Sequence, residues 1–460
     1  MRLIVKPVSR FLFSGEGKEL LLAGTMRINV REHLEIGGCD TVELAETFGT
    51  PLYIMDEALI RENCRRYQEA LQSSYPRGEI LYAGKAFLIK AMAALVAEEG
   101  LGLDVVSGGE IFTAIKAGFP PEHLCFHGNN KSGEEILFAL QTGVGRIVVD
   151  SLSELEELIA LSVKAEKRPT ILLRIKPGVE AHTHDYIQTG QDDSKFGFGL
   201  KNEDTWKAIR LAIQEKEKVD LVGFHCHIGS QIFQTEPFAL AVDVMFAFMA
   251  EIREKTGFTA SQLDMGGGLG IRYIKEDTPP SIENFVDSIS AAVKNAASKR
   301  DFPLPRLLLE PGRSITGEAG ITLYRVGVIK DIPGIRRYVA VDGGMADNIR
   351  PALYQAVYDV ALANKAGEKP AEKVTIAGKN CESGDILVQE AILPPVKKDD
   401  ILVLFATGAY CYAMANNYNR NPRPAVLFVR DGKANIVARR ETYEDLVLLD
   451  QPVQKKNLPS

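Results

Sequence analysis

The stretch EILYAGKAFLIKAM, residues 79–92, sets a lysine inside an otherwise apolar segment. Residues 80–83 have the composition of a buried strand, Lys85 follows them, and a second apolar run begins at once. Lysine is almost never fully buried without a partner, and in an apolar pocket it loses its proton readily and becomes a nucleophile toward carbonyls. The plainer alternative is a stem lying along the core with its ammonium in water. The features that surround Lys85 in the fold decide between the two.

The same strand-like signal returns along the chain at regular intervals. Eight such runs occur: ILYAGKA (80–86), LGLDVVS (101–107), LCFHG (124–128), RIVVD (146–150), ILLRIKPG (171–178), LVGFHCHIG (221–229), QLDMGGG (262–268) and LLLEPGR (307–313). Amphipathic helical segments separate most of them. This alternation predicts an α/β fold with a (β/α)8 barrel of the TIM type, and an open doubly wound sheet is the competing architecture.

The sequence on both sides of the predicted barrel has a different texture. From Ile315 onward, short strands alternate with Gly, Asp and Pro and long helices disappear, which predicts a mainly β C-terminal domain. The first fifty residues share this texture. We therefore expect an N-terminal segment (1–51) that packs with the β domain, a barrel (52–313) and the β domain itself (314–460).

Composition narrows the class of protein. The chain has 460 residues, 45% of them hydrophobic, and a net charge of -7, which argues against binding to nucleic acid or anionic membranes. No stretch has the eighteen or so consecutive apolar residues of a membrane helix, and the N-terminus lacks a signal-peptide core. Six scattered cysteines without a CxxC pair suit reduced thiols, so a cytoplasmic location is expected.

Polar residues and glycines gather at the ends of the predicted strands, where barrel enzymes carry their chemistry. They include Lys85, Arg174, HCHIGS (225–230), DMGGGLG (264–270) and EPGRS (310–314). Three successive glycines let backbone N–H groups approach an anion, to which Ser230 and Arg313 could add a hydroxyl and a charge. The Gly84–Lys85 pair is no P-loop, because Ala86 replaces the Ser or Thr that holds magnesium.

A metal-dependent TIM-barrel hydrolase is the main rival reading of these strand ends. His182 and His184 are two residues apart, as are His225 and His227, and on a strand this spacing puts both rings on one side. A metal site would leave Lys85 and the glycine triplet unexplained, so no metal is expected. A buried lysine, a glycine-lined anion site, an acid (Glu310) and a flat ring partner (His227) together indicate pyridoxal phosphate instead.

Longer motifs point to a known family. The chain resembles the diaminopimelate decarboxylases, within the fold-type III pyridoxal-phosphate decarboxylases, over about residues 51–418. The motifs are YAGKA (82–86), HCHIGSQ (225–231), GGGLG (266–270), EPGRS (310–314), RPALY (350–354), CESGD (381–385), GAY (408–410) and the loop at 182–198. YAGKAF departs from the commoner YAxKAN form but keeps the lysine.

The resemblance implies an activity and a role for each matching residue. The activity is decarboxylation of meso-2,6-diaminopimelate to L-lysine and carbon dioxide, the last step of lysine biosynthesis. The implied cofactor residues are Lys85 as covalent carrier, His227 stacked on the ring, Glu310 at the pyridine nitrogen, and Ser230, Gly266, Gly267, Gly268, Gly312, Arg313 and Tyr410 around the phosphate. The implied substrate residues are Arg313, Arg350 and Tyr354 at the distal carboxylate, Glu382 at the distal ammonium and Cys381 as proton donor to Cα, and Tyr410 also belongs to the substrate site.

The family also implies a partner, since each subunit would supply CESGD to the barrel of the other in a homodimer. Three alternatives stay open from the residues alone. They are a related decarboxylase acting on carboxynorspermidine, arginine or ornithine, a barrel that carries the cofactor without enzymatic activity, and the metal-dependent hydrolase.

Overall fold

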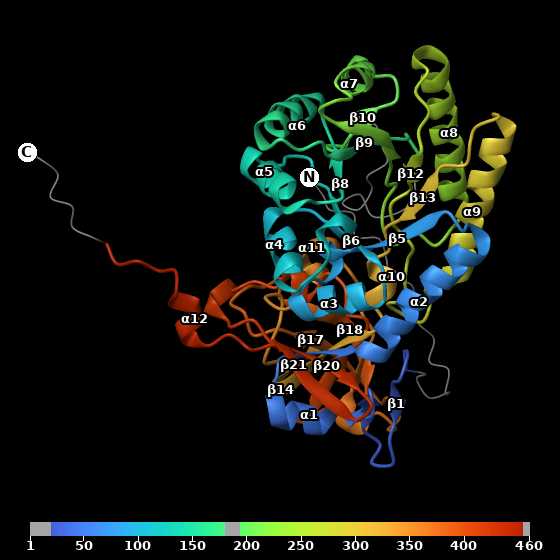
Figure 1. Cartoon of the computed structure of the whole chain (residues 1–460). Coiled ribbons are helices and arrows are strands. Elements are labelled where there is room, and N and C mark those ends of the chain that lie inside the picture. The colour runs from blue at the N-terminus through green and yellow to red at the C-terminus, as the bar shows by residue number, and fades with distance from the viewer. Residues whose placement is uncertain (1–19, 180–193, 454–460) are drawn as a thin grey trace, which may run out of the picture.

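A computed structural model describes residues 20–179 and 194–453, which form a parallel barrel and a mainly β domain (Figure 1). The barrel strands are β5 (Gly78–Ala83), β6 (Gly102–Val105), β7 (Leu124–Phe126), β8 (Arg146–Val149), β9 (Thr170–Lys176), β11 (Asp220–His225), β12 (Gln262–Asp264) and β13 (Arg306–Leu309). Neighbours pair in parallel, and β13 pairs with β5 to close the ring. All eight predicted strands are therefore present, and the closed barrel is confirmed over the open sheet.

The barrel interior is filled by side chains. Leu81, Cys125, Val148, Leu172 and Leu308, one from each of five strands, form a cluster with almost no exposed surface. Since helices cover the outer face, most strand residues are buried on both sides and read as continuous apolar runs. A packed interior leaves the loops at the carboxyl ends of the strands as the place where a ligand can bind.

Helices surround the barrel (Figure 1). They are α2 (Glu57–Ser74), α3 (Lys90–Glu98), α4 (Gly108–Lys116), α5 (Gly133–Thr142), α6 (Leu152–Ala165), α7 (Glu203–Gln214), α8 (Glu236–Thr256) and α9 (Ile282–Lys299). Local capping fixes several of their starts. Ser132 and Glu135 form a capping box at α5, and Asp56 caps α2 through the Leu59 N–H.

The second domain is built on a mainly antiparallel sheet. Its strands are β4 (Leu52–Asp56), β14 (Gly320–Ile332), β15 (Arg336–Val341), β16 (Val360–Leu362), β17 (Glu372–Ala377), β18 (Ile386–Leu393), β19 (Ile401–Leu404), β20 (Ala425–Arg430) and β21 (Lys433–Ala438). The long strand β14 joins the sheet together, because it pairs with β4, β15 and β19.

Strand β4 lies in this second sheet, where it pairs antiparallel with β14 and parallel with β20. The first barrel element is therefore α2. By this pairing, the expected start of the barrel at residue 52 comes one strand too early, because it includes β4. A short buried apolar run carries no signal for which of two sheets it joins. The chain thus crosses from the β domain into the barrel at Asp56, which ends β4 and caps α2.

The described part of the N-terminal segment forms β1 (Arg27–Ile28), β2 (Leu34–Ile36), β3 (Cys39–Asp40) and α1 (Thr41–Phe48). Leu34, Ile36 and Leu44 share a buried cluster with Ile54 and Ile321 of the β domain. In Figure 1 these elements accordingly lie at the end of the molecule away from the barrel.

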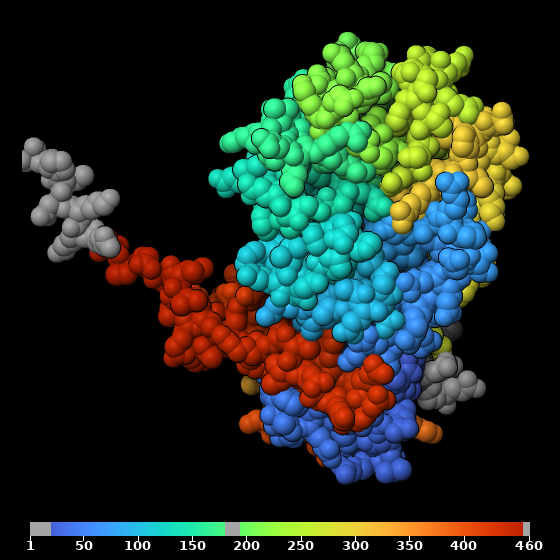
Figure 2. Space-filling model, viewed as in Figure 1, coloured from blue at the N-terminus to red at the C-terminus, as the bar shows by residue number. Residues whose placement is uncertain are grey.

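Besides short 3-10 turns, the described residues also form β10 (Phe198–Gly199), α10 (Arg313–Thr316), α11 (Arg350–Tyr354) and α12 (Tyr443–Val447). The segment that contains α12 projects from the body of the molecule (Figure 2). In the described ranges, we find no helix with the length and apolar character needed to span a bilayer.

Candidate active site

A cavity of about 750 Å³ opens at the carboxyl ends of the barrel strands. Eight of the residues predicted for cofactor or substrate binding line it: Lys85, His227, Ser230, Glu310, Arg313, Arg350, Tyr354 and Tyr410. They come from the barrel and from the β domain, so the cavity lies where the two meet. Residues far apart in the sequence are thereby brought to one site.

Lys85 follows β5 in a single 3-10 turn, Gly84–Ala86, and its exposed surface borders this cavity. Burial acts to lower the pKa of Lys85, but the carboxylates of Asp104 and Glu310 outweigh it, and the net pKa is raised. The lysine is therefore an ammonium beside acids when no ligand is bound. Its amine must lose this proton before it can attack a carbonyl.

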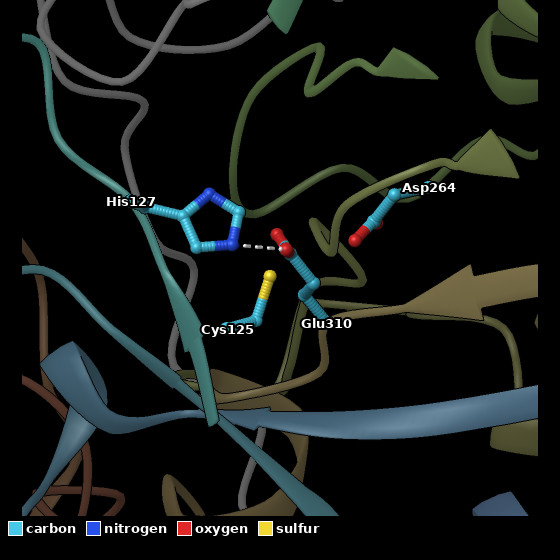
Figure 3. A group of neighbouring side chains, drawn as sticks. All are labelled: Cys125, His127, Asp264 and Glu310. Atoms are coloured by element: carbon cyan, nitrogen blue, oxygen red, sulfur yellow. Dashed lines mark ion pairs between the residues drawn. The ribbon is translucent and has the colours of Figure 1, made fainter. Parts of the chain in front are cut away.

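Glu310 follows β13 and meets two histidines. Its Oε1 lies 2.8 Å from Nε2 of His127, and its Oε2 lies 3.4 Å from Nε2 of His225. All three side chains have at most 5% of their surface exposed. Figure 3 shows that Asp264 also points its carboxyl toward Glu310.

The glycine triplet lies behind the cavity wall. A Cβ on Gly266 would come within 2.7 Å of His227 Nδ1, and one on Gly267 within 2.1 Å of the Glu310 carbonyl oxygen. Side chains at these positions would displace His227 and Glu310, so the glycines are needed to bring both residues to the cavity. Gly312 is similarly tight, with Ala83 Cβ at 2.9 Å. Phosphate contacts of Gly266–Gly268 and Gly312 stay a prediction.

Two arginines and two tyrosines also line the cavity. Arg313 donates to Ser230 Oγ at 2.9 Å and to the Tyr273 hydroxyl at 2.5 Å. The Arg350 guanidinium lies 5.5 Å from the ring centre of Tyr273 and 5.6 Å from that of Tyr410, and Arg313 contacts the same two rings. The aromatic faces hold two like charges close together, which suits a carboxylate ligand.

Cys381 and Glu382 do not line the cavity; both are exposed at the surface of the β domain. Hydrogen bonds nevertheless hold the backbone of their loop. Buried Asp385 accepts from the N–H groups of Met345 and Asn380, and Asn419 accepts from the Cys381 N–H at 2.7 Å. A structured loop thus presents a thiol and a carboxylate to the outside.

Sequence reasoning missed four residues of the site: Asp104, His127, Asp264 and Tyr273. His127 belongs to the run LCFHG and Asp264 to DMGGGLG, both recognised as strand ends, but neither residue was given a role. Their position at strand ends was the available signal. Tyr273 lies in an irregular segment after β12, where no periodic pattern fixes the direction of a side chain.

The metal alternative concerns the two predicted histidine pairs and one further group of potential ligands. His182 and His184 lie outside the described residues, whereas His225 and His227 both line the cavity. A buried group that shares His127 and Glu310 with the cavity wall also includes Cys125 and Asp264, and one potential ligand atom from each of the four residues lies within 4.8 Å of the others (Figure 3). The ion pair between His127 and Glu310 already occupies two of these side chains.

Comparisons with known proteins agree with this geometry. A family model described as pyridoxal-dependent decarboxylase, pyridoxal binding domain, matches residues 57–317. The diaminopimelate decarboxylase of Bacillus subtilis is 54% identical, over 94% of this chain and 98% of that protein. The enzyme of that name from Halalkalibacterium halodurans is 51% identical over the same shares.

A solved structure of diaminopimelate decarboxylase from M. jannaschii in complex with L-lysine has a TM-score of 0.86 and 36% identity, and covers 93% of this chain and 98% of that one. The fold and the cavity are those of a pyridoxal-dependent decarboxylase. More narrowly, this chain belongs to the diaminopimelate decarboxylase family. The hydrolase alternative is thereby set aside.

The residues present fit pyridoxal phosphate, the cofactor of this family. Lys85 offers an amine at the cavity floor, Glu310 an anion within the same pocket, and Ser230 and Arg313 a hydroxyl and a charge for a phosphate. His227 also lines the cavity, and packing behind it leaves no room for a side chain on Gly266. The predicted cofactor thus meets a matching set of groups.

Proposed function

We propose that this chain decarboxylates meso-2,6-diaminopimelate to L-lysine and carbon dioxide with bound pyridoxal phosphate. The observation that carries the proposal is the pairing, in one cavity, of Lys85 with two guanidiniums, Arg313 and Arg350. Relatives that are 54% and 51% identical carry the name diaminopimelate decarboxylase, and a solved relative of that name holds L-lysine.

The arginines account for the choice of substrate. Lysine, ornithine and arginine have no second carboxylate, whereas diaminopimelate has one at its distal end. Arg350 has about 8% of its surface exposed, so leaving its charge without an anion would be costly. A substrate with a distal carboxylate satisfies the two charges. Tyr354, whose ring centre lies 5.7 Å from the Arg350 guanidinium, would add a hydroxyl.

The reaction needs an electron sink and a proton donor. Bound pyridoxal phosphate supplies the sink when the bond to the α-carboxylate breaks. Lys85 would hold the cofactor, Glu310 would supply a negative charge for its ring nitrogen, and His227 would support the ring. Cys381 returns a proton to Cα, and Glu382 binds the distal ammonium.

These last two roles require a second subunit. Cys381 and Glu382 are ordered but exposed, and they lie outside the cavity of their own chain. We propose a homodimer in which the loop of residues 378–385 of each subunit completes the cavity of the other. The six free thiols suit a reducing compartment, and the cytoplasm stays the proposed location.

Product analysis tests the activity. Protein loaded with pyridoxal phosphate should release lysine and carbon dioxide from meso-diaminopimelate and turn over ornithine, arginine and carboxynorspermidine at least about a hundredfold more slowly, the scale set by an unpaired buried charge. Borohydride reduction followed by peptide mapping should place the cofactor on Lys85. Equal turnover of ornithine would contradict the proposed substrate.

Subunit mixing tests the shared site. Lys85→Ala and Cys381→Ala chains should each be inactive alone. After reassembly, about a quarter of wild-type activity should return, because half of randomly formed dimers are mixed and each has one intact site. As the control, the Lys85→Ala chain is mixed with a Lys85→Ala/Cys381→Ala chain. This mixture should stay inactive, because neither chain then carries Lys85. Activity that does not return in verified mixed dimers would exclude sharing.

A further inference from the structure

Two buried histidines lie against the carboxylate of Glu310, His127 at ion-pair distance and His225 at hydrogen-bond distance. His127 reaches Oε1 at 2.8 Å and His225 reaches Oε2 at 3.4 Å. The two rings stand edge to face, with centroids 5.0 Å apart, so each addresses a different oxygen. The arrangement uses both oxygens of one carboxylate, and Figure 3 shows the ion pair with His127.

Asp264 lies beside this pair. Its carboxyl group is protonated, so it brings no second negative charge. Burial, together with the charge of Glu310, raises the pKa of Asp264 well above its ordinary value. Its Oδ1 accepts the Gly266 N–H at 2.8 Å, which fixes the carboxyl in place. Asp264 is therefore held neutral next to an anion.

Other charged groups face the same point. Asp104 Oδ1 lies 3.7 Å from His127 Nε2, farther than Glu310, and burial raises the pKa of Asp104 as well. Lys85 and Arg174 contribute positive charge to the surroundings. Of the three buried acids, Asp104, Asp264 and Glu310, the last is the one whose ionised form the site favours.

The direction for Glu310 itself follows from its partners. Burial acts to raise its pKa, but His127 and His225 outweigh burial, and the pKa of Glu310 lies well below the usual value. Burial lowers the pKa of His225 to about 4, so near neutral pH its ring is uncharged, and an Nε2 proton donated to Glu310 fits the contact. The charge in the cluster is thus concentrated on one carboxylate.

This matters once a ring nitrogen shares a proton with Glu310. A proton between two bases rests on the more basic one, and donors on a carboxylate make that carboxylate less basic. A Glu310 without these donors would take the proton and leave a neutral ring, which is a poorer electron sink. The histidines therefore bear on the electronic state of the cofactor through Glu310.

We propose that His127 is a positioning residue that, together with His225, keeps Glu310 anionic in the loaded enzyme, so that the shared proton stays on the cofactor ring nitrogen. The inference rests on the proposed function, because it concerns the same cofactor. It adds a role for a residue that does not contact the reacting atoms.

The test compares three variants of His127 with a matched control. His127→Gln keeps an N–H donor at the reach of Nε2, His127→Asn has one that is too short, and His127→Phe has none. His123 precedes the same strand, β7, at its other end and is exposed, so His123→Phe is the control for a lost histidine. Each protein is loaded with cofactor carrying nitrogen-15 in its ring, and the chemical shift of that nitrogen reports its protonation.

Wild type, His127→Gln and His123→Phe should give the shift of a protonated ring nitrogen. His127→Asn and His127→Phe should move toward the neutral value and lose about ten- to a hundredfold in kcat, the scale of one hydrogen bond to a charged group, with little change in KM. If His127→Phe does not fold, as judged by thermal unfolding, the comparison of Asn with Gln carries the test.

An unchanged nitrogen shift in His127→Asn or His127→Phe would overturn the inference, as would stoichiometric metal bound by Cys125, His127, Asp264 and Glu310 in the purified protein. Failure of the proposed function is distinguishable, since it would appear in the wild type as absence of bound cofactor or of lysine formation.

Discussion

The barrel mouth and the loop of residues 378–385 satisfy their charged groups in opposite ways. At the barrel mouth, Glu310, His127 and His225 are buried and in contact with one another. In the loop, Cys381 and Glu382 are exposed, while the buried Asp385 and Asn380 hold the backbone in shape. At the barrel mouth, the reactive side chains are buried and bind one another. In the loop, only the backbone is held by buried partners, and the reactive side chains are exposed.

This difference suggests a division of labour. Groups that hold the cofactor and set its charge need low dielectric and fixed partners, which one chain can provide. A proton donor that must reach the substrate from the opposite side can come from another subunit, provided that its loop is rigid. Substitutions in the barrel mouth and in the loop should therefore have different effects, of which the loss of Lys85 should be the largest.

Replacing Lys85 should have the largest effect, because it removes the proposed covalent attachment point of the cofactor. We expect Lys85→Ala to lose about 10⁴-fold or more in kcat/KM and to release the cofactor on dialysis. Lys90 is exposed at the start of α3, and Lys90→Ala should behave like wild type. Retained cofactor absorbance in dialysed Lys85→Ala would place the attachment elsewhere.

Replacing Cys381 should affect the reaction but not the cofactor. Loss of a positioned proton donor predicts a fall of about 10²–10⁴-fold in kcat for Cys381→Ala, with normal cofactor content. Cys39, half-buried in β3 of the N-terminal segment and outside the cavity lining, offers the matched Cys39→Ala control. A Cys381→Ala enzyme with wild-type kcat would remove the loop from the chemistry.

The contrast between the regions also marks what the sequence could reveal. Barrel strands such as β9 and β6 are predictable because burial on both faces makes them continuous apolar runs between helices. The assignment of β4 to the second sheet is not, since its five residues are buried in a way that suits either domain. Pairing partners are decided by contacts more than 250 residues away, such as that between Leu52 and Leu323.

The site divides in the same way. Lys85, Glu310 and Arg313 stand in recognisable motifs at strand ends and could be proposed from the sequence. His127 and Asp264 could not be given roles, because their importance lies in distances to Glu310 that only the closed barrel creates. The exposure of Cys381 was likewise invisible, since CESGD reads the same whether it faces its own cavity or that of a partner.

Removing the hydroxyl of Tyr273 should have a smaller effect, confined to substrate binding. Arg313 would keep Ser230 as a partner but lose the Tyr273 oxygen, and the two guanidiniums would be held less firmly. We expect Tyr273→Phe to raise KM for meso-diaminopimelate about tenfold with kcat nearly unchanged. Tyr443→Phe, on the exposed α12, is the control. A fall in kcat alone would assign the hydroxyl a different role.

Replacing Asp347, which lies beside the partners of the loop of residues 378–385, should have the smallest effect on activity. Its Oδ2 accepts the Gly344 N–H at 2.9 Å, and the neighbouring Met345 N–H binds Asp385. Burial, aided by Asp342 and Asp385 against Lys379, raises the pKa of Asp347 to about 7. An unfolded chain has the ordinary value of about 4. Between about pH 4 and pH 7 the folded protein therefore binds more protons, so this group stabilises most at low pH and its contribution is lost as pH rises to about 7.

Asp347→Asn should remove that slope, because the amide stays neutral at every pH and can still accept from Gly344. Since one unit of pKa corresponds to about 1.36 kcal/mol, the variant should gain at most about 4 kcal/mol over wild type above pH 7 and nothing near pH 4. Denaturant unfolding at several pH values measures this. Asp331→Asn, at an acid with 62% of its side chain exposed, should leave the slope as it is. Parallel stability curves for wild type and Asp347→Asn would mean that Asp347 is ionised in the folded protein, and that the loop rests on a buried charge rather than on a neutral acid.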